Sequence, residues 1–288
     1  MISKEEMKLR RDKVIKNWEI NKDKGRFITE LAKECNVTPE TYRKYLREVG
    51  YDPKGVIYKY KCDRSFFKVI DTERKAYWLG FIYADGNVSI QEGNAYILSI
   101  TLGEKDKHHL EKFQQDIGTN IKIYPKKAIN PYTNLEVLTY RIDISSKELC
   151  MDLIDKGCTP CKSLTKKFPK GVPNNLMNHF LRGYFDGNGS LVFRKSNINY
   201  DINITSSIQF LNNLMDYLKS TLNITPTKIY LPKLRINDGW GTWYKRGREA
   251  KIVLDYLYQD STIYLDRKYL IYKDLSTINS AKSVKAKS

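Results

Sequence analysis

The sequence predicts an α+β protein in which one αββαββα arrangement occurs twice, preceded by a small all-α module. A ten-residue segment, Tyr77–Gly86, has a similar counterpart at Phe180–Gly189, 103 positions later. The first fifty residues instead carry the pattern of three short helices. An apolar fraction of 41% is sufficient for a packed core in each part, so a disordered chain is excluded.

The N-terminal module is expected to span residues 1–52, with helices over Lys4–Asn21, Ile28–Cys35 and Pro39–Val49. Thr38 fits the N-cap of the third helix and Pro39 its first position. The side chains that would face inward in a helix-turn-helix are Ile28, Leu31, Ala32, Val37, Tyr42, Tyr45 and Leu46. A small Ala32 would allow the two helices to cross closely.

The third helix would then present a polar face to a DNA groove. That face carries Glu40, Thr41, Arg43, Lys44 and Arg47. A helical hairpin with a solvated charged face is the alternative. The net charge of +17 favours DNA binding, because lysine and arginine neutralise phosphates and release counterions.

Residues 53–70 are predicted to be a linker, which contains Pro53 and Gly55 before alternating tyrosines and lysines. The two halves of the repeat are expected at 71–170 and 171–274, with their junction at Gly171–Asn175. Residues 275–288 are rich in serine and lysine, which predicts a disordered basic tail.

Other elements repeat at the same offset. The helical stretch Ser207–Lys219 corresponds to one that begins at Glu104, and the alternating stretches Tyr96–Leu102 and Asp201–Thr205 follow the two motifs. Two similar halves in one chain predict a pseudo-twofold arrangement with matching parts at the axis.

One copy of the motif alone would indicate a buried helix that ends at a glycine. Two copies indicate more, because Gly80 and Ala84 share a helical face, as do Gly183 and Gly187. Small residues at this spacing let two helices approach more closely than the usual ~8–10 Å. The paired helices would then end together and bring Asp85 beside Asn188.

A carboxylate at the negative end of a helix dipole is unfavourable unless a cation lies beside it. Hard oxygen ligands suit Mg²⁺, which keeps several waters and binds phosphate oxygens; Mn²⁺ could replace it. The chemistry this implies is phosphodiester hydrolysis by a metal-activated water.

The segments WLGFIYADG (Trp78–Gly86) and LRGYFDGNG (Leu181–Gly189) resemble the two motifs of monomeric LAGLIDADG homing endonucleases. The resemblance runs from about Phe66 to about Tyr272 and includes phrases such as IYLDRKY. It implies motif helices at the interface between halves, saddle-shaped antiparallel sheets along double-stranded DNA, and divalent metal at the last acid of each motif. The metal set implied is Asp85 and Asn188, with Gly86 and Gly189.

Basic residues near strand ends assist catalysis in the family, which makes Arg246 and its neighbour Lys245 candidates. A plain phosphate contact is the alternative for both. The second motif departs from the family because it has Asn188 where an acid is usual, and an amide brings no charge and cannot act as a base. Asp186 is a poor substitute, since residues two apart do not share a helical face.

The sheets are expected to supply most DNA contacts, chiefly to phosphates. An ordinary solvated surface is the alternative for this set. Together with Thr41, Arg43, Lys44 and Arg47, the candidates are Lys122, Lys126, Lys127, Arg141, Arg194, Lys195, Lys228, Lys233 and Arg235.

Several other classes are disfavoured. No apolar run approaches the ~20 residues of a membrane span, and the first residues lack a secretory apolar stretch, so we expect a cytoplasmic monomer. Cys158 and Cys161 form a CxxC without a second ligand pair, which favours two reduced thiols over a zinc or redox site.

The leading hypothesis is therefore a site-specific, Mg²⁺-dependent DNA endonuclease. The replacement at Asn188 leaves reduced cleavage, strand-biased nicking and binding without cutting open. A DNA-binding regulator on a catalytically silent scaffold is the main alternative, and an RNA maturase is a weaker one.

Overall fold

The computed structural model describes residues 3–22, 28–51, 60–129, 133–160, 167–194, 199–231 and 239–273. Residues 53–59 of the expected linker, Cys161, Lys195, Lys233, Arg235 and the expected tail lie outside the described residues. The chain divides into two compact units. Unit 1 contains Met1–Asp63 and Gly118–Ile121, and unit 2 contains Arg64–Ile117 and Lys122–Ser288.

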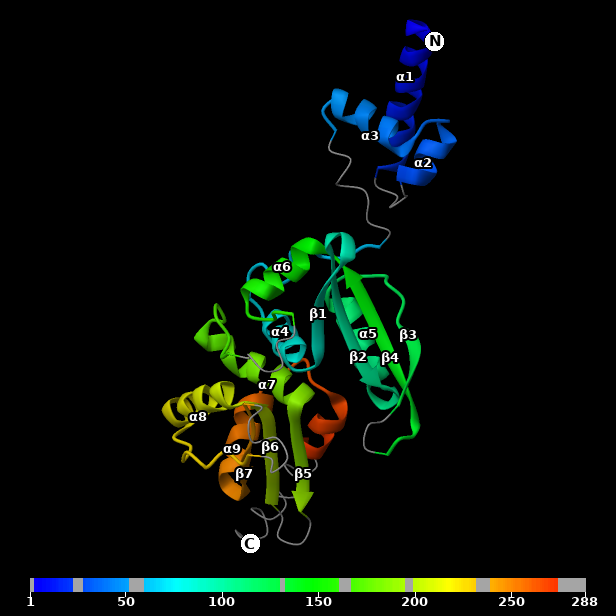
Figure 1. The fold of residues 1–288 in the computed structure, drawn as a ribbon. Coiled ribbons are helices and arrows are strands. Elements are labelled where there is room, and N and C mark those ends of the chain that lie inside the picture. The colour runs from blue at the N-terminus through cyan, green and yellow to red at the C-terminus, as the bar shows by residue number, and fades with distance from the viewer. Residues whose placement is uncertain are drawn as a thin grey trace, which may run out of the picture. The chain divides into compact units, whose positions relative to one another are not determined.

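Unit 1 contains three helices, α1 (Lys4–Asn21), α2 (Ile28–Glu34) and α3 (Pro39–Glu48) (Figure 1). The hydroxyl of Thr38 caps α3 by accepting a 3.1 Å bond from the amide of Thr41, and Asn36 turns the chain between α2 and α3 with a φ of 55°. The helices enclose a small core of Val14, Trp18, Ile28, Leu31, Ala32, Cys35, Tyr42 and Leu46.

The first half of unit 2 has the predicted αββαββα order. Its elements are α4 (Glu73–Asp85), β1 (Gly86–Gln91), β2 (Ala95–Gly103), α5 (Lys107–Asp116), β3 (Tyr124–Ile129), β4 (Glu136–Ser145) and α6 (Lys147–Asp155). Short 3-10 turns, η2 (Glu92–Asn94) and η3 (Glu104–Asp106), precede β2 and α5. The strands form an antiparallel sheet in the order β1-β2-β4-β3.

The second half repeats this order with one difference. Its elements are η4 (Asn174–Leu176), α7 (Met177–Asn188), β5 (Gly189–Arg194), β6 (Asn199–Ser207), α8 (Ile208–Leu222), β7 (Trp240–Arg246) and α9 (Gly247–Tyr258). The antiparallel order is β5-β6-β7, and a single bridge between Tyr230 and Thr242 stands where β3 pairs in the first half. Residues 266–273 form a further helical segment.

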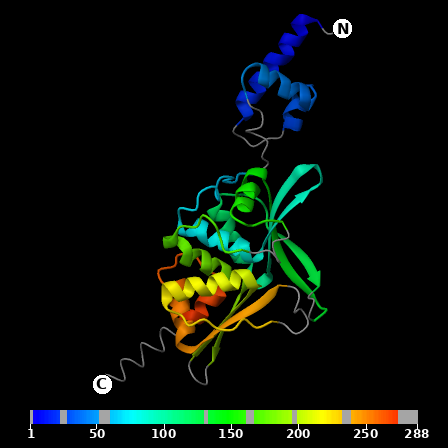
Figure 2. The same cartoon turned by 60° about the vertical axis from the view of Figure 1, so that its left-hand side comes forward.

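Each sheet has one apolar and one polar face, because side chains alternate along a strand. Leu98, Ile100, Ile142 and Ile144 in the first sheet, and Ile202, Ile204 and Trp243 in the second, are buried. Helices α5 and α6 contact the first sheet, and α8 and α9 contact the second. Figure 2 shows the helices of unit 2 gathered on one side and its strands on the other.

Candidate functional site

Helices α4 and α7 pack directly against each other at the middle of unit 2 (Figure 1). A Cβ atom on Gly80 would lie 1.9 Å from the carbonyl oxygen of Phe180, and one on Gly183 would lie 2.0 Å from that of Tyr77. These contacts are reciprocal at the 103-residue offset, which is the signature of a pseudo-twofold axis. Only a residue without a side chain allows this approach.

The same helices end together. A Cβ on Gly187 would lie 2.3 Å from the Cβ of Ala84 and 3.3 Å from the Cγ of Asp85. Asp85 therefore lies against the residue that precedes Asn188, at the tips of both helices. Asp85 is exposed and Asn188 is half-buried. The ends of the two motif helices therefore lie side by side.

Each motif is a direct junction between a helix and a strand. Gly86 begins β1 and Gly189 begins β5, both with extended rather than left-handed backbone. Their lack of a side chain is required by space, since a Cβ on Gly86 would lie 2.6 Å from Ile82 Cγ2 and one on Gly189 would lie 2.2 Å from Phe185 Cδ2. Each helix thus ends at a glycine as expected, and close packing is the reason that a glycine is required there.

The amide group of Asn188 is oriented by α7. Its Nδ2 donates a 3.2 Å hydrogen bond to the hydroxyl of Tyr184, which in turn lies 2.6 Å from Ser206 Oγ. The carbonyl oxygen Oδ1 of Asn188 is therefore the atom that can ligate a cation.

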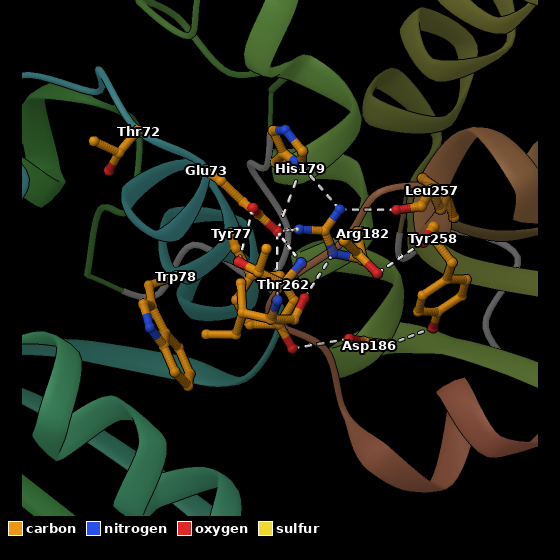
Figure 3. Close-up of polar contacts among 12 residues, drawn as sticks. Thr72, Glu73, Tyr77, Trp78, His179, Arg182, Asp186, Leu257, Tyr258 and Thr262 are labelled. Carbon is orange, nitrogen blue, oxygen red and sulfur yellow. Dashed lines mark hydrogen bonds and ion pairs between the residues drawn. The ribbon is translucent and has the colours of Figure 1, made fainter.

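Asp186 points away from this site into the protein. Its side chain is 1% exposed and accepts hydrogen bonds from Tyr77 (2.8 Å), Tyr258 (2.5 Å) and the amide of Leu265 (2.8 Å). Figure 3 shows this carboxylate between the two halves of unit 2. Burial raises the pKa of Asp186, while Lys268 and these donors act in the opposite direction. Asp186 cannot replace the missing acid at position 188.

Sequence reasoning did not single out Lys268, which is buried beneath the end of α7. Its ammonium donates to the carbonyl oxygens of Phe185 (2.6 Å), Asp186 (2.8 Å) and Gly189. A cation at a helix C-terminus stabilises the last carbonyls. Burial lowers the pKa of Lys268 to about 8. The resemblance of its segment to the family was the one signal for it in the sequence.

This contact bears on one expected metal ligand, the carbonyl oxygen of Gly189, whose role as a ligand stays a prediction. The carbonyl of Gly189 already accepts a hydrogen bond from the Lys268 ammonium, so a second cation there would meet charge repulsion.

Arg182 is a second buried charged residue that joins the two halves of unit 2, near the hydrogen bonds around Asp186. Arg182 is 0% exposed, and its guanidinium donates to Glu73 (2.6 Å), Leu257 O (2.8 Å) and Ile263 O (2.8 Å) (Figure 3). Although burial acts to raise it, the hydrogen bonds from Thr262 and the charge of Arg182 hold the pKa of Glu73 below its usual range. Helices α4 and α7 are thus joined by an ion pair as well as by glycines.

His109, in the first half, contacts Tyr77, the residue that donates to Asp186. These contacts define the tautomer of its imidazole ring. The hydroxyl of Tyr77 donates to Asp186, so His109 Nε2, 2.9 Å away, must carry the hydrogen that this hydroxyl accepts. Its Nδ1 is then an unprotonated nitrogen, and this buried atom has no hydrogen-bond partner among the residues that the structure describes. Burial lowers the pKa of His109 well below its ordinary value.

This arrangement makes the stability of unit 2 fall on acidification. The folded protein excludes the proton that the unfolded chain binds below about pH 6.5, so stability is lost as pH falls through that value. Between pH 7.5 and 5.5, wild type should lose about 1.4 kcal/mol more of its unfolding free energy than a His109→Gln variant, measured by urea unfolding. Equal losses in the two proteins would show that His109 is protonated in the folded state.

Lys245 does not lie where the catalytic role expected for it, as a basic residue near a strand end, would require. It lies on the same face of β7 as buried Trp243, is 3% exposed, and donates to Glu249 Oε2 (2.7 Å) and to the carbonyl of Thr225. Its ammonium is therefore committed within the core and cannot reach a DNA strand.

Arg246 is exposed but lies away from the helix tips. Gly189 pairs with Ile204, whereas Arg246 pairs with Asp201, three residues further along β6. At a rise of ~3.3 Å per residue this is about 10 Å along the strand. Arg246 belongs with the sheet surface and not with Asp85 and Asn188.

The remaining candidates lie on exposed or half-buried surface in the described parts of the chain. Arg141 is held by Asp143 (2.7 Å) and Ser99 (2.8 Å), Lys127 lies 2.9 Å from Glu136, and Arg194 lies 2.5 Å from Asp201. In unit 1, Arg43 and Thr41 are half-buried and Lys44 and Arg47 are exposed. Lys122, Lys126 and Lys228 are also exposed.

The donors at the helix tips fit a hydrated Mg²⁺ and not an enclosed metal cage. Within the described ranges, no group of three or more histidine, cysteine, aspartate or glutamate side chains could hold a metal ion. One carboxylate and one amide oxygen remain at the tips, and Mg²⁺ is commonly held by one or two carboxylates with waters and phosphate oxygens.

No model of a known protein family matches the chain. An uncharacterized protein of Methanocaldococcus jannaschii is 28% identical over 155 residues, which cover 52% of this chain and 54% of that protein. The chain thus spans about half the length of this relative. No helix in the described part of the chain is both long and apolar enough to span a membrane.

Solved structures with a similar fold are LAGLIDADG homing endonucleases. The homing endonuclease I-WcaI, bound to its DNA recognition sequence, has a TM-score of 0.50 at 12% identity, over 77% of this chain and 96% of that chain. I-SmaMI, bound to uncleaveable DNA, has a TM-score of 0.48 at 18% identity, over 70% and 88%. The chain therefore has the LAGLIDADG homing-endonuclease fold, with both motif helices in one polypeptide.

Proposed function

We propose that this protein is a site-specific DNA endonuclease of the homing type, which acts on double-stranded DNA as a single chain. The observation that supports the proposal is that Asp85 lies beside Gly187, the neighbour of Asn188, at the tips of two glycine-packed helices. A cation stabilises a carboxylate at the negative end of a helix dipole, and hard oxygen ligands suit Mg²⁺. The structural neighbours are named as nucleases bound to DNA, which is consistent with this proposal.

In this proposal each residue of the site has its own role in phosphodiester hydrolysis. Asp85 supplies the single negative charge of the site, and Asn188 Oδ1 supplies a neutral oxygen from the other half. Mg²⁺ or Mn²⁺, when bound, would supply an activated water and stabilise the leaving oxygen. The polar faces of the two sheets would position the DNA strands across the helix tips.

Unit 1 would add a second DNA contact through a helix-turn-helix formed by α2 and α3. Thr38 caps α3 and leaves Lys44 and Arg47 on its exposed surface. Outward basic side chains in these positions support the proposal that α3 is a recognition helix.

A regulator that binds DNA without cutting it is the second candidate, and Asn188 is the observation that favours it. The amide lowers the negative charge of the site from two to one relative to a two-acid site, which weakens attraction for a divalent ion.

One experiment separates the two functions. The wild-type protein and an Asn188→Asp variant are incubated with a duplex DNA library and Mg²⁺, and broken ends and bound fragments are sequenced separately. Breaks produced by both proteins support an active enzyme, and single-strand breaks from wild type alone would assign a nicking activity. Breaks from the variant alone support a silenced scaffold, and selective binding without breaks from either supports the regulator.

A further inference from the structure

The polar face of the second sheet carries a cluster of two arginines around one aspartate. Arg194 on β5, Asp201 on β6 and Arg246 on β7 lie on three neighbouring strands. Asp201 is paired directly with Arg246 and with Val192, and Arg194 is two residues beyond Val192 on the same face. The buried side chains Leu191, Tyr200, Ile202 and Lys245 alternate with this set, so the cluster faces outward.

Asp201 fixes the orientation of Arg194. The Nε of Arg194 donates a 2.5 Å hydrogen bond to Asp201 Oδ2, and the Nε of Arg246 lies 3.7 Å from the same oxygen. The aspartate side chain is 17% exposed, whereas those of Arg194 and Arg246 are 53% and 72% exposed. The carboxylate thus forms the floor of the cluster and the guanidinium groups form its surface.

This hydrogen bond leaves the two terminal NH₂ groups of the Arg194 guanidinium available to a ligand. Since Nε–H is directed at Asp201, the two terminal NH₂ groups are the donors that face outward. Arg194 lines a cavity of about 430 Å³ together with Asn199, Asp201, Arg246 and Gly247. A planar pair of donors with fixed direction matches the N7 and O6 acceptors of guanine in the major groove.

A phosphate could also accept from two guanidinium donors, but the cluster is less suited to it. The Asp201 carboxylate lies within hydrogen-bonding distance of Arg194 and repels an approaching phosphate. Arginine can bind phosphate in a bidentate manner too, so the choice rests on the negative charge of Asp201, which opposes a phosphate but not a neutral base edge.

Resting on the proposed DNA-binding function, we propose that Arg194, oriented by Asp201, reads one guanine in the half-site bound by the second half of the chain. Arg194 is then a specificity-determining residue and Asp201 a positioning residue. The neighbouring Arg246 supplies positive charge beside the same base pair.

The test uses the full chain and measures binding without cleavage. A duplex library is first selected for binding to wild type in the absence of divalent metal. The selection is repeated with Arg194→Lys, Asp201→Asn and Arg248→Lys. Arg248 is the matched control, because it is an exposed arginine in the first turn of α9 and not on the sheet face.

The proposal predicts that one guanine is enriched with wild type and Arg248→Lys, and that its preference falls about 5- to 150-fold with Arg194→Lys. Asp201→Asn should relax the same position. Replacing that guanine with 7-deazaguanine, which lacks the N7 acceptor, should weaken wild type by a similar factor and leave Arg194→Lys unaffected.

A phosphate contact would give a different pattern. Arg194→Lys would then weaken binding to all sequences alike, and Asp201→Asn would strengthen binding to all sequences because it removes a negative charge. Either outcome overturns the inference and leaves the proposed function standing. Absence of any enriched sequence with wild type would overturn the proposed function itself.

Discussion

Replacing Asp85 with asparagine should abolish DNA cleavage while DNA affinity stays unchanged. Within the described ranges, Asp85 is the one motif carboxylate exposed at the paired helix tips, since Asp186 is buried and Asn188 is uncharged. Stabilisation of charge in the transition state through a metal site is worth several kcal/mol, so the cleavage rate should fall on the order of a thousandfold. Cleavage of a selected target at saturating Mg²⁺ gives the rate, and a mobility-shift titration gives the affinity.

The comparison that makes this result specific is the double variant Asp85→Asn with Asn188→Asp. It moves the single carboxylate to the other half of a pseudo-symmetric site. We expect it to recover part of the lost activity if the two positions share one metal environment. Normal cutting by Asp85→Asn alone would remove Asp85 from the mechanism, and loss of affinity would mean that the substitution disturbs the DNA-binding surface.

The second large effect concerns the helix crossing. Gly183→Ala should destabilise unit 2 by roughly 3 kcal/mol or more, because the new methyl group would lie 2.0 Å from the carbonyl oxygen of Tyr77 and 2.9 Å from the amide nitrogen of Phe81. These are backbone atoms and cannot move aside as a flexible side chain would. Helix α4 would have to shift away from α7.

Gly103→Ala is the matched control for this prediction. Gly103 ends β2 with an extended φ of −64°, and a Cβ there would meet nothing within 4 Å. The urea unfolding midpoint of Gly103→Ala should match that of wild type. The midpoint of Gly183→Ala should fall sharply, or that variant should fail to fold. A Gly183→Ala protein with wild-type stability would show that the helices are further apart than described.

Much of the fold follows from local signals. The helices of unit 1 begin at the predicted residues, and α2 and α3 end one residue before the predicted ends. The 103-residue offset correctly pairs Gly80 with Gly183 and places Ala84 against Gly187. These features depend on periodicity and residue size, which a sequence displays directly.

One error could have been avoided from the sequence. Lys245 lies two residues from Trp243 in a strand, so both share a face, and a buried tryptophan predicts a buried neighbour. Considered as part of β7, the lysine belongs to the core and Arg246 to the surface, as the structure shows.

The buried network at the end of α7 could not be predicted in this way. Asp186 lies 109 positions from Tyr77, 72 from Tyr258 and 82 from Lys268 in the sequence. No spacing rule connects residues at such separations. Their partnership arises because each is brought from a different element to one low-dielectric position, where an unpaired charge would be costly.

The sequence by itself determined two glycine-faced helices, one acid at the end of the first, and an amide at the end of the second. The tertiary structure alone decided which polar groups surround them. Lys268 donates a hydrogen bond to the carbonyl oxygen of Gly189, and Asp186 accepts hydrogen bonds in the protein interior. Asp201 orients Arg194 on the sheet surface. The reason is physical: periodicity fixes the direction in which each side chain leaves its own element, whereas a charge finds its partner only when distant elements pack together.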